Sequence, residues 1–314
     1  MPRKYMSRFR FSLLFAGVIL VAAFARTYFL QRVPEVALPV NTEESIINIG
    51  VSDESVPAII DPVFETVPAA DGYLQNDGQG IVLIDGKQAK FFPFQILVWH
   101  NLVNDFWNGS PILVVYDPLC GGAAVFERNN DSQVFVNSGK IYNNSLLFRV
   151  SEAETLWSSF SGKILSGGSG ELDKIPSLVM SWQNFRSSFP NGKVLSRETG
   201  SSRDYSENPY GSYSSSPDVW YPLTKYDSSL PAKTFVYGYG DMAFPKDNIK
   251  SSGRIIAETG IGKIAFVWDG DLETVRGFES EPDESLGKEI ALSPAYWFCW
   301  VANTESSGIR LNLD

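Results

Sequence analysis

The chain has 314 residues, 44% of them apolar and 13% aromatic, and carries a net charge of -10 at neutral pH. This length accommodates one large domain or two small ones, and the aromatic content favours a β-rich interior. No run of lysine or arginine occurs beyond residue 33. The chain therefore lacks the basic stripe that nucleic-acid binding requires, and we exclude nucleic acid as a partner.

The first 30 residues have the pattern of a targeting segment. Four basic residues precede an apolar stretch over residues 11–25, namely Arg3, Lys4, Arg8 and Arg10. The stretch Ala23–Ala25 fits a signal-peptide cleavage site, whereas apolar residues that continue to Leu30 also permit an uncleaved membrane anchor. Either alternative places the following domain on the extracytoplasmic side. We predict a cell-membrane protein, or a secreted one if the segment is cleaved, with the membrane as its partner.

Residues 31–56 are polar and weakly patterned and are predicted to be a tether, with the folded domain over residues 57–314. A hairpin is predicted from Gly80 to Lys90, because Asp85-Gly86 separates two apolar runs. Pro93 then favours a single helical turn that ends near Val98.

The next hairpin brings the only histidine of the chain to an acidic residue. Asn108-Gly109 is typical of a two-residue type I′ turn between strands 100–107 and 110–117. That register places Asn104 opposite Leu113 and His100 opposite Asp117. Because alternate side chains share a face, His100, Asn104 and Asp117 are predicted to lie on one surface. Cys120 follows in the next turn.

Later segments complete a fold that we assign to the α+β class, mainly antiparallel β with a few helices. Strands are predicted over residues 133–137 and 145–150, and an amphipathic helix over residues 177–189. Residues 203–217 are predicted to be a long loop. Ser293-Pro294 has the signature of the start of the last helix.

A weak internal repeat raises the alternative of two related β-rich halves. Phe92-Pro93 and Tyr116-Asp117 recur, at the same separation, as Phe244-Pro245 and Trp268-Asp269. Chance coincidence of common strand residues explains the pattern equally well. The second copy differs at the two positions of chemical interest, with Ser252 for His100 and Leu272 for Cys120. If the repeat is real, any chemistry belongs to the first half.

The chain resembles the bacterial and archaeal domain-of-unknown-function family 3179 over most of residues 57–303. The resemblance rests on many colinear segments: 58–62, Phe92–Leu97 with Trp99-His100, 103–105, Tyr116–Phe126 with Arg128, 138–139, 142–143, 155–158, 195–200, Arg203–Tyr205, 208–210 and Tyr296–Phe298. The resemblance implies no established activity.

One departure from the family pattern affects the chemistry. Members of the family usually have Cys-Pro-Leu-Cys where this chain has Asp117-Pro118-Leu119-Cys120. A disulfide within this motif is therefore impossible here, which argues against dithiol redox catalysis. A metal site remains open, because a carboxylate can replace a thiolate as a ligand.

Three functions stay open, and the sequence does not decide whether the chain is an enzyme. The first is a zinc or copper site made by His100, Asp117 and Cys120. The second is a thiol enzyme in which Cys120 is the nucleophile, His100 the base, and Asn104 or Asp117 the residue that orients the imidazole. The third is a non-catalytic binding or envelope module with an unknown protein or small-molecule partner.

In the third interpretation His100 donates to Asp117 within the core, and Cys120 is a small buried residue. The long loop then provides either a partner surface or a solvated segment held by Arg–Asp pairing; its notable residues are Arg197, Arg203, Asp204, Tyr205 and Tyr210. A disulfide between Cys120 and Cys299 suits an exported chain. Cys299 lies in an apolar helical context and Cys120 in a glycine-rich turn, so two separate thiols remain the alternative.

Overall fold

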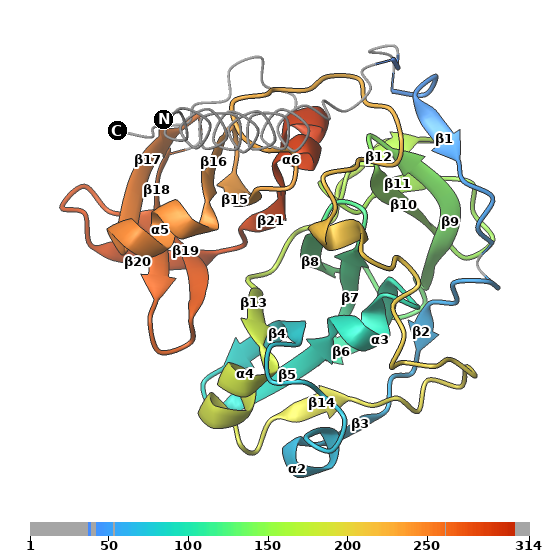
Figure 1. Cartoon of the computed structure of the whole chain (residues 1–314), viewed down its shortest axis with the longest axis horizontal. Helices are drawn as coiled ribbons and strands as arrows, with labels where there is room; N and C mark the ends of the chain where they lie inside the picture. The colour runs from blue at the N-terminus through green and yellow to red at the C-terminus, as the bar shows by residue number, and fades with distance from the viewer. Residues whose placement is uncertain (1–36, 39–41, 53, 261, 305–314) are drawn as a thin grey trace, which may run out of the picture.

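The structure is a computed structural model that describes residues 37–38, 42–52, 54–260 and 262–304. Strands dominate it, the helices are short, and nearly all strand pairs are antiparallel, which confirms the β-rich α+β class (Figure 1). The predicted signal or anchor segment, residues 1–30, lies outside the described residues. In the part of the chain that is described, no helix combines the length and apolar character needed to cross a bilayer.

The first structural unit contains both predicted hairpins. Its elements in chain order are β4 (Gln79–Asp85), β5 (Gln88–Pro93), α3 (Phe94–Leu97), β6 (Leu102–Trp107), β7 (Ser110–Asp117), β8 (Gly122–Glu127), β13 (Leu178–Ser181) and α4 (Trp182–Ser188). Strands β13, β4 and β5 are neighbours in one sheet, and β6, β7 and β8 form a meander in another.

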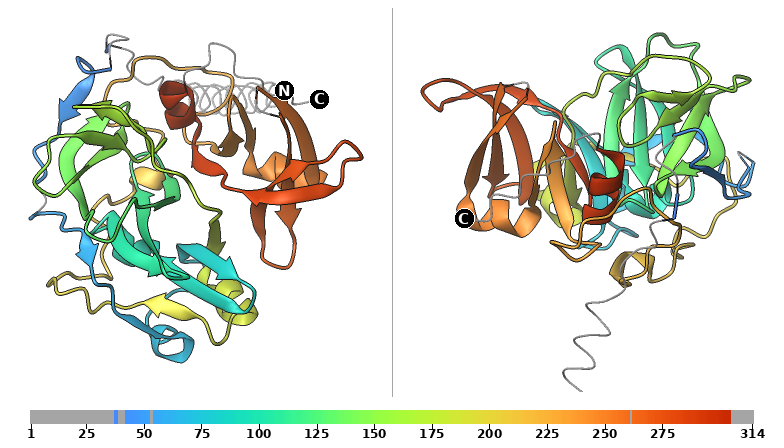
Figure 2. Two further views of the ribbon diagram at one scale, coloured as in Figure 1. Left: turned by 180° about the vertical axis from the view of Figure 1, so that it is seen from behind. Right: turned by 90° about the horizontal axis from the view of Figure 1, so that it is seen from above.

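The second unit lies beside the first and has a similar order of elements, with one more strand, β20 (Figure 2). It consists of β15 (Phe235–Tyr239), β16 (Met242–Pro245), α5 (Lys246–Ser252), β17 (Arg254–Thr259), β18 (Gly262–Asp269), β19 (Thr274–Ser280), β20 (Leu286–Ile290), β21 (Ser293–Tyr296) and α6 (Trp297–Asn303). The sheet order β21-β15-β16 corresponds to β13-β4-β5, and β17-β18-β19 corresponds to β6-β7-β8.

Positions with similar surroundings in the two units are 152 residues apart in the first part of each unit and 115 residues apart in the last part. Pro93 and Pro245 each end the second strand of a hairpin and cap the helix that follows, 152 residues apart. Later, Phe126 faces Lys174 as Phe278 faces Glu289. Lys174 and Glu289 are only 115 residues apart, so the first unit holds 37 more residues between β8 and Lys174.

The extra residues form most of an additional sheet. Its strands are β1 (Ile46–Asn48), β9 (Phe135–Tyr142), β10 (Ser145–Val150), β11 (Leu156–Ser158) and β12 (Ile164–Ser166). Strand β1 comes from the segment predicted as a tether and pairs with β9. The remaining elements extend the sheets of the first unit: β2 (Ile59–Ile60), β3 (Phe64–Thr66), α2 (Val67–Ala70) and β14 (Lys193–Leu195).

The meander of the first unit is buried on both faces, which explains the continuous apolar run in β7. Ile112 and Val114 pack in one core cluster with residues of β4 and β5. Leu113 and Val115 pack on the opposite face with Phe135 and Phe148 of the additional sheet. A strand covered on both sides is under no pressure to alternate apolar with polar residues.

The predicted register of this hairpin is confirmed up to its last step. Asn108 and Gly109 both have positive φ, as a type I′ turn requires, and Leu102 pairs with Val115. The ladder ends there, because Asn101 adopts a left-handed conformation with φ of 61° and turns the chain out of the strand. The prediction that His100 lies opposite Asp117 is therefore wrong.

Two helix starts were also predicted too early, for one common reason. Each helix is preceded directly by a short strand, β13 before α4 and β21 before α6, so the apolar runs begin in a sheet. The Ser181 hydroxyl caps α4 by accepting a hydrogen bond from the Asn184 N–H. Pro294 is tolerated in β21 because that strand lies at the edge of its sheet.

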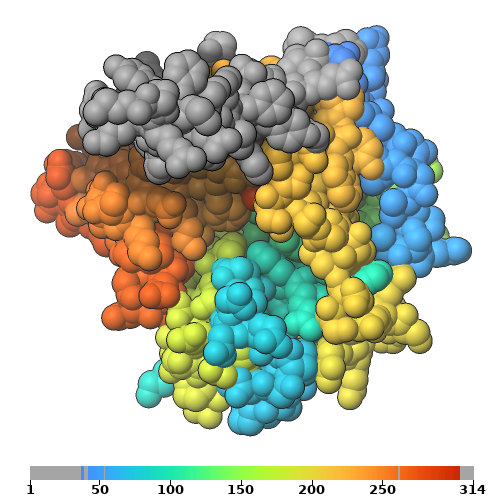
Figure 3. All heavy atoms as spheres, in the orientation of Figure 1, coloured from blue at the N-terminus to red at the C-terminus, as the bar shows by residue number. Residues whose placement is uncertain are grey.

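A long connection joins the two units. Between β14 and β15 the only regular element is a short 3-10 turn, Tyr213–Ser215. In Figure 3 this segment, coloured yellow to gold, crosses the face of the molecule from the first unit toward the second. It supplies Tyr205 to the core around His100.

Candidate functional site

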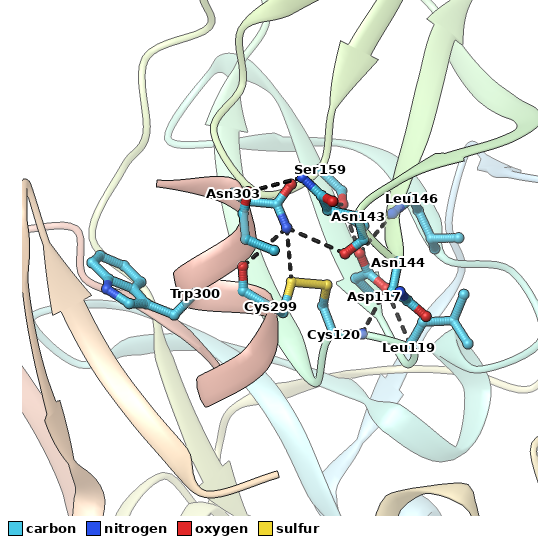
Figure 4. The surroundings of a disulfide bond; sticks show 12 residues. Asp117, Leu119, Cys120, Asn143, Asn144, Leu146, Ser159, Cys299, Trp300 and Asn303 are labelled. Carbon is cyan, nitrogen blue, oxygen red and sulfur yellow. Dashed lines mark hydrogen bonds between the residues drawn. A yellow bond between two sulfur atoms is a disulfide. The ribbon is translucent and has the colours of Figure 1, made fainter. Parts of the chain in front are cut away.

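The two cysteines form a disulfide, which decides the alternative left open by the sequence. Cys120, in the turn after β7, is bonded to Cys299 of α6, with their Cα atoms 5.4 Å apart (Figure 4). Both cysteines are buried. In this oxidised form neither sulfur is a thiolate, and a thiolate is what both a nucleophile and a metal ligand require.

Asp117 closes the turn that carries Cys120. Its Oδ1 accepts hydrogen bonds from the N–H groups of Leu119 and Cys120, both at 3.2 Å. Its Oδ2 accepts from the Leu146 N–H and the Ser159 hydroxyl, both at 2.8 Å. Burial raises the pKa of Asp117, and these donors oppose the rise. The carboxylate therefore fastens the turn to the additional sheet.

His100 has partners other than those predicted. Its Nδ1 lies 2.7 Å from the Pro57 carbonyl oxygen and must donate to it, because a carbonyl only accepts. In the neutral ring Nε2 then accepts from the Tyr205 hydroxyl, also at 2.7 Å. The Tyr205 oxygen lies 2.5 Å from Thr199 Oγ1. Burial is the largest effect on the pKa of His100 and lowers it, which favours the neutral ring.

Asn104 is committed to the backbone and is no partner of the imidazole. Its side-chain amide donates to the Phe135 carbonyl at 2.9 Å and accepts from the Phe135 N–H at 2.8 Å. This pair of hydrogen bonds holds the start of β9 against β6. The orienting role predicted for Asn104 is thus not supported by its contacts.

The structure does not assemble the predicted metal ligands. Asp117 and Cys120 share one turn, whereas His100 is bonded to Pro57 and Tyr205. Across the described ranges, no group of three or more His, Cys, Asp and Glu side chains could hold a metal ion. The zinc or copper site on His100, Asp117 and Cys120 is therefore not formed in this state.

The turn around Cys120 has an equivalent in the second unit. Asp269 Oδ1 accepts from the Leu272 N–H at 3.0 Å, as Asp117 accepts from Cys120. Leu272 in turn receives a hydrogen bond on its carbonyl from Asn184 of α4, at 3.4 Å. Asn184 stands 115 residues before Cys299, the separation of the two units at these helices. The turn after β18 is thus joined to α4 by a hydrogen bond, whereas the turn after β7 is joined to α6 by the disulfide.

The loop residues singled out from the sequence do not form Arg–Asp pairs. Arg203 donates to the Ser55 carbonyl, at 2.6 Å, and stacks over Trp99. Arg197 lies over the Tyr73 ring, 3.8 Å from its centroid. Asp204 instead accepts from the N–H and hydroxyl groups of Ser206. Cation–π contacts and turn hydrogen bonds hold this loop, where the Arg–Asp pairing was predicted.

A cleft that sequence reasoning missed lies between the additional sheet and the second unit. It has a volume of about 670 Å³, within the range of small-molecule sites. Its lining comes from five separate parts of the chain: Thr42; Tyr142; residues 158–174 (Ser158, Phe160, Ser161, Lys163, Leu165, Glu171, Lys174); Thr224 and Lys225; and the second unit (Gly240, Asp241, Ser293, Trp300, Ala302, Asn303, Thr304). Because these parts are far apart in the sequence, no local motif predicts such a site.

Lys174 lies between this cleft and a much smaller cavity beside the disulfide. The smaller cavity, about 10 Å³, is lined among others by Asp117, Cys120 and Ser159. The Lys174 ammonium donates to the Phe160 carbonyl at 2.7 Å and to the Ser293 hydroxyl at 2.6 Å. Burial lowers its pKa to about 8. Lys174 and Ser293 are 119 residues apart in the sequence, so the contact joins the two units.

A family model described as "Protein of unknown function (DUF3179)" matches residues 53–307. The chain belongs to this family. The match includes both units, strands β9 to β12 of the additional sheet, the disulfide and the cleft-lining residues from Tyr142 to Thr304. No curated protein and no solved structure matches the chain.

Proposed function

We propose that the chain is an extracytoplasmic, membrane-tethered binding module, and that the cleft is its ligand site. The observation that carries this proposal is the cleft itself, with its volume of about 670 Å³ and its mixed polar and apolar lining. The histidine, aspartate and cysteine that attracted attention in the sequence are engaged in structural bonds. In the proposal they serve stability.

The buried disulfide supports an extracytoplasmic location, because disulfides persist in oxidising compartments. The positively charged, apolar N-terminal sequence supports export independently. In cells whose thiols are trapped with acid and then alkylated, we expect both cysteines to be found oxidised. A chain with two alkylated cysteines would contradict this location.

We also propose that the two units are related halves of one domain. The shared element order, the shared sheet order and the constant separation of 152 residues from Pro93 to Asp117 support this relation. Equivalent turns capped by Asp117 and Asp269 support it further. The cleft is then specific to one junction, because the additional sheet that lines it belongs to the first half.

Native mass spectrometry tests the binding role directly. The full chain is incubated with a mixture of small metabolites and examined for bound mass. Ser161→Trp places an indole in the cleft, and we expect it to abolish the adduct. Ser188→Trp, an exposed position on α4, is the matched control and should leave the adduct unchanged. Equal binding by wild type and Ser161→Trp would remove the cleft from consideration.

A further inference from the structure

The ammonium of Lys174 lacks an anionic partner within the described chain. Both acceptors of its hydrogen bonds, the Phe160 carbonyl and the Ser293 hydroxyl, are neutral. None of the ion pairs between described residues includes Lys174, although Glu171 is near enough to raise its pKa. The rings of Phe160 and Phe126 lie 5.6 and 6.0 Å from the nitrogen. Lys174 is only partly exposed, and a cation with little water around it and no counter-ion is costly, so its retention needs a reason.

At the equivalent position of the second unit, the charged side chain has a partner of opposite charge. Glu289, which corresponds to Lys174, forms an ion pair with Arg276 at 2.8 Å. That charge is therefore neutralised inside the chain. The strand position accepts either sign of charge, so the fold alone does not require a lysine at position 174.

The third N–H of Lys174 is available to a ligand. An ammonium group has three donors, and the structure accounts for two of them. Because Lys174 also lines the cleft, an oxygen atom of a bound molecule can reach it from that side. Trp300, another lining residue, has an indole Nε1 that is buried and has no hydrogen-bond partner among the described atoms.

Five charged side chains among the described residues line the cleft. Lys163, Lys174 and Lys225 line it, against Glu171 and Asp241. Tyr142 is the remaining titratable side chain of the lining, and Asp117 lies behind Lys174 in the smaller cavity.

We propose that the cleft binds a small molecule through a carboxylate or phosphate group, with Lys174 as the counter-ion. This inference rests on the proposed binding function and names the ligand chemistry of the same site. Lys174 is a binding residue here, and no covalent step is involved.

Thermal unfolding and calorimetric titration of the full chain test this inference. The probes are succinate and inorganic phosphate, each compared with chloride at equal ionic strength. We expect one of the two oxyanions to bind, and Lys174→Met to weaken it at least tenfold. Lys87→Met, at an exposed hairpin position, is the control and should bind like wild type. The oxyanion that binds identifies the group.

The pH dependence gives a second measurement. The Lys174 ammonium is charged below its pKa of about 8, so anion binding is expected at pH 6.5 and should be largely lost at pH 9.5. Binding that is unchanged in Lys174→Met, or no binding of either oxyanion, overturns the inference. A neutral metabolite bound by wild type but not by Ser161→Trp would then leave the binding function in place. If no compound binds, both proposals fail.

Discussion

Removal of the Cys120–Cys299 link is predicted to cost a large part of the stability of the protein. The two cysteines are separated by 179 residues. In the chain-entropy treatment, a closed loop of that length lowers the free energy of the folded relative to the unfolded state by roughly 5 kcal/mol at 25 °C. Folded domains are stable by only about 5–15 kcal/mol, so the link contributes a large share of the free energy of unfolding.

Single and double alanine variants separate the covalent link from the packing of two sulfur atoms. Cys120→Ala and Cys299→Ala each break the link, so each should lose about 3–5 kcal/mol in urea unfolding. The double variant should lose little more than either single variant, because the link can be lost only once. The slope against urea should also rise, since the unfolded chain is no longer restrained.

The contact between Asn184 of α4 and the turn after β18 provides a control. Asn184→Ala removes two reversible contacts, the hydrogen bonds to the Leu272 carbonyl and to Glu273 Oε2, and should cost only about 0.5–1.5 kcal/mol. Two single cysteine variants that each lose about half of the double variant's effect would refute the reasoning, because that pattern indicates packing. A wild-type sample in which both cysteines titrate as thiols, and whose stability equals that of the disulfide-bonded protein, would refute it as well.

Three further substitutions test the local assignments. Burial lowers the pKa of His100 below its unfolded value of about 6.5, so the unfolded state binds protons more readily and stability falls as the pH drops through that value. His100→Gln should therefore make the urea midpoint depend less on pH between pH 5 and 7. An unchanged pH dependence would argue against the neutral ring. Asn104→Leu should cost about 2–4 kcal/mol in thermal unfolding, because it leaves the Phe135 N–H and carbonyl buried without partners. The control is Asn130→Leu at an exposed position, which should change stability by less than about 0.5 kcal/mol. Asp117→Asn should cost about 2 kcal/mol in urea unfolding, since an amide N–H would face donors from Leu146 and Ser159; an unaltered midpoint would show that the carboxylate does not hold the turn.

Local sequence signals predicted local structure well. The Asn108-Gly109 turn set the register of β6 and β7, and Pro93 marked the start of α3, because both effects depend on backbone geometry within a few residues. The same reasoning failed one step further, at His100, where the left-handed conformation of Asn101 ends the ladder. A pairing rule applied along a strand does not predict the residue at which a left-handed conformation ends that strand.

The site depends on contacts that sequence spacing does not encode. Lys174 is hydrogen-bonded to Ser293, and His100 to Tyr205, and in each case the partner is more than one hundred residues away in the sequence. The weak repeat was matched in the sequence only over residues 92–117 and 244–269. Once the positions of β13 and β21 are known, the separation of 115 residues relates Asn184 to Cys299 and Lys174 to Glu289.

The late position of α6 has a consequence for the order in which the molecule matures. Cys120 emerges during synthesis long before Cys299, and these are the only two cysteines in the sequence. No wrong bridge can form within one chain during that interval, so an isomerase has nothing to correct. The closing oxidation instead reports that the two units have docked, and it makes assembly of the junction effectively irreversible in an oxidising compartment.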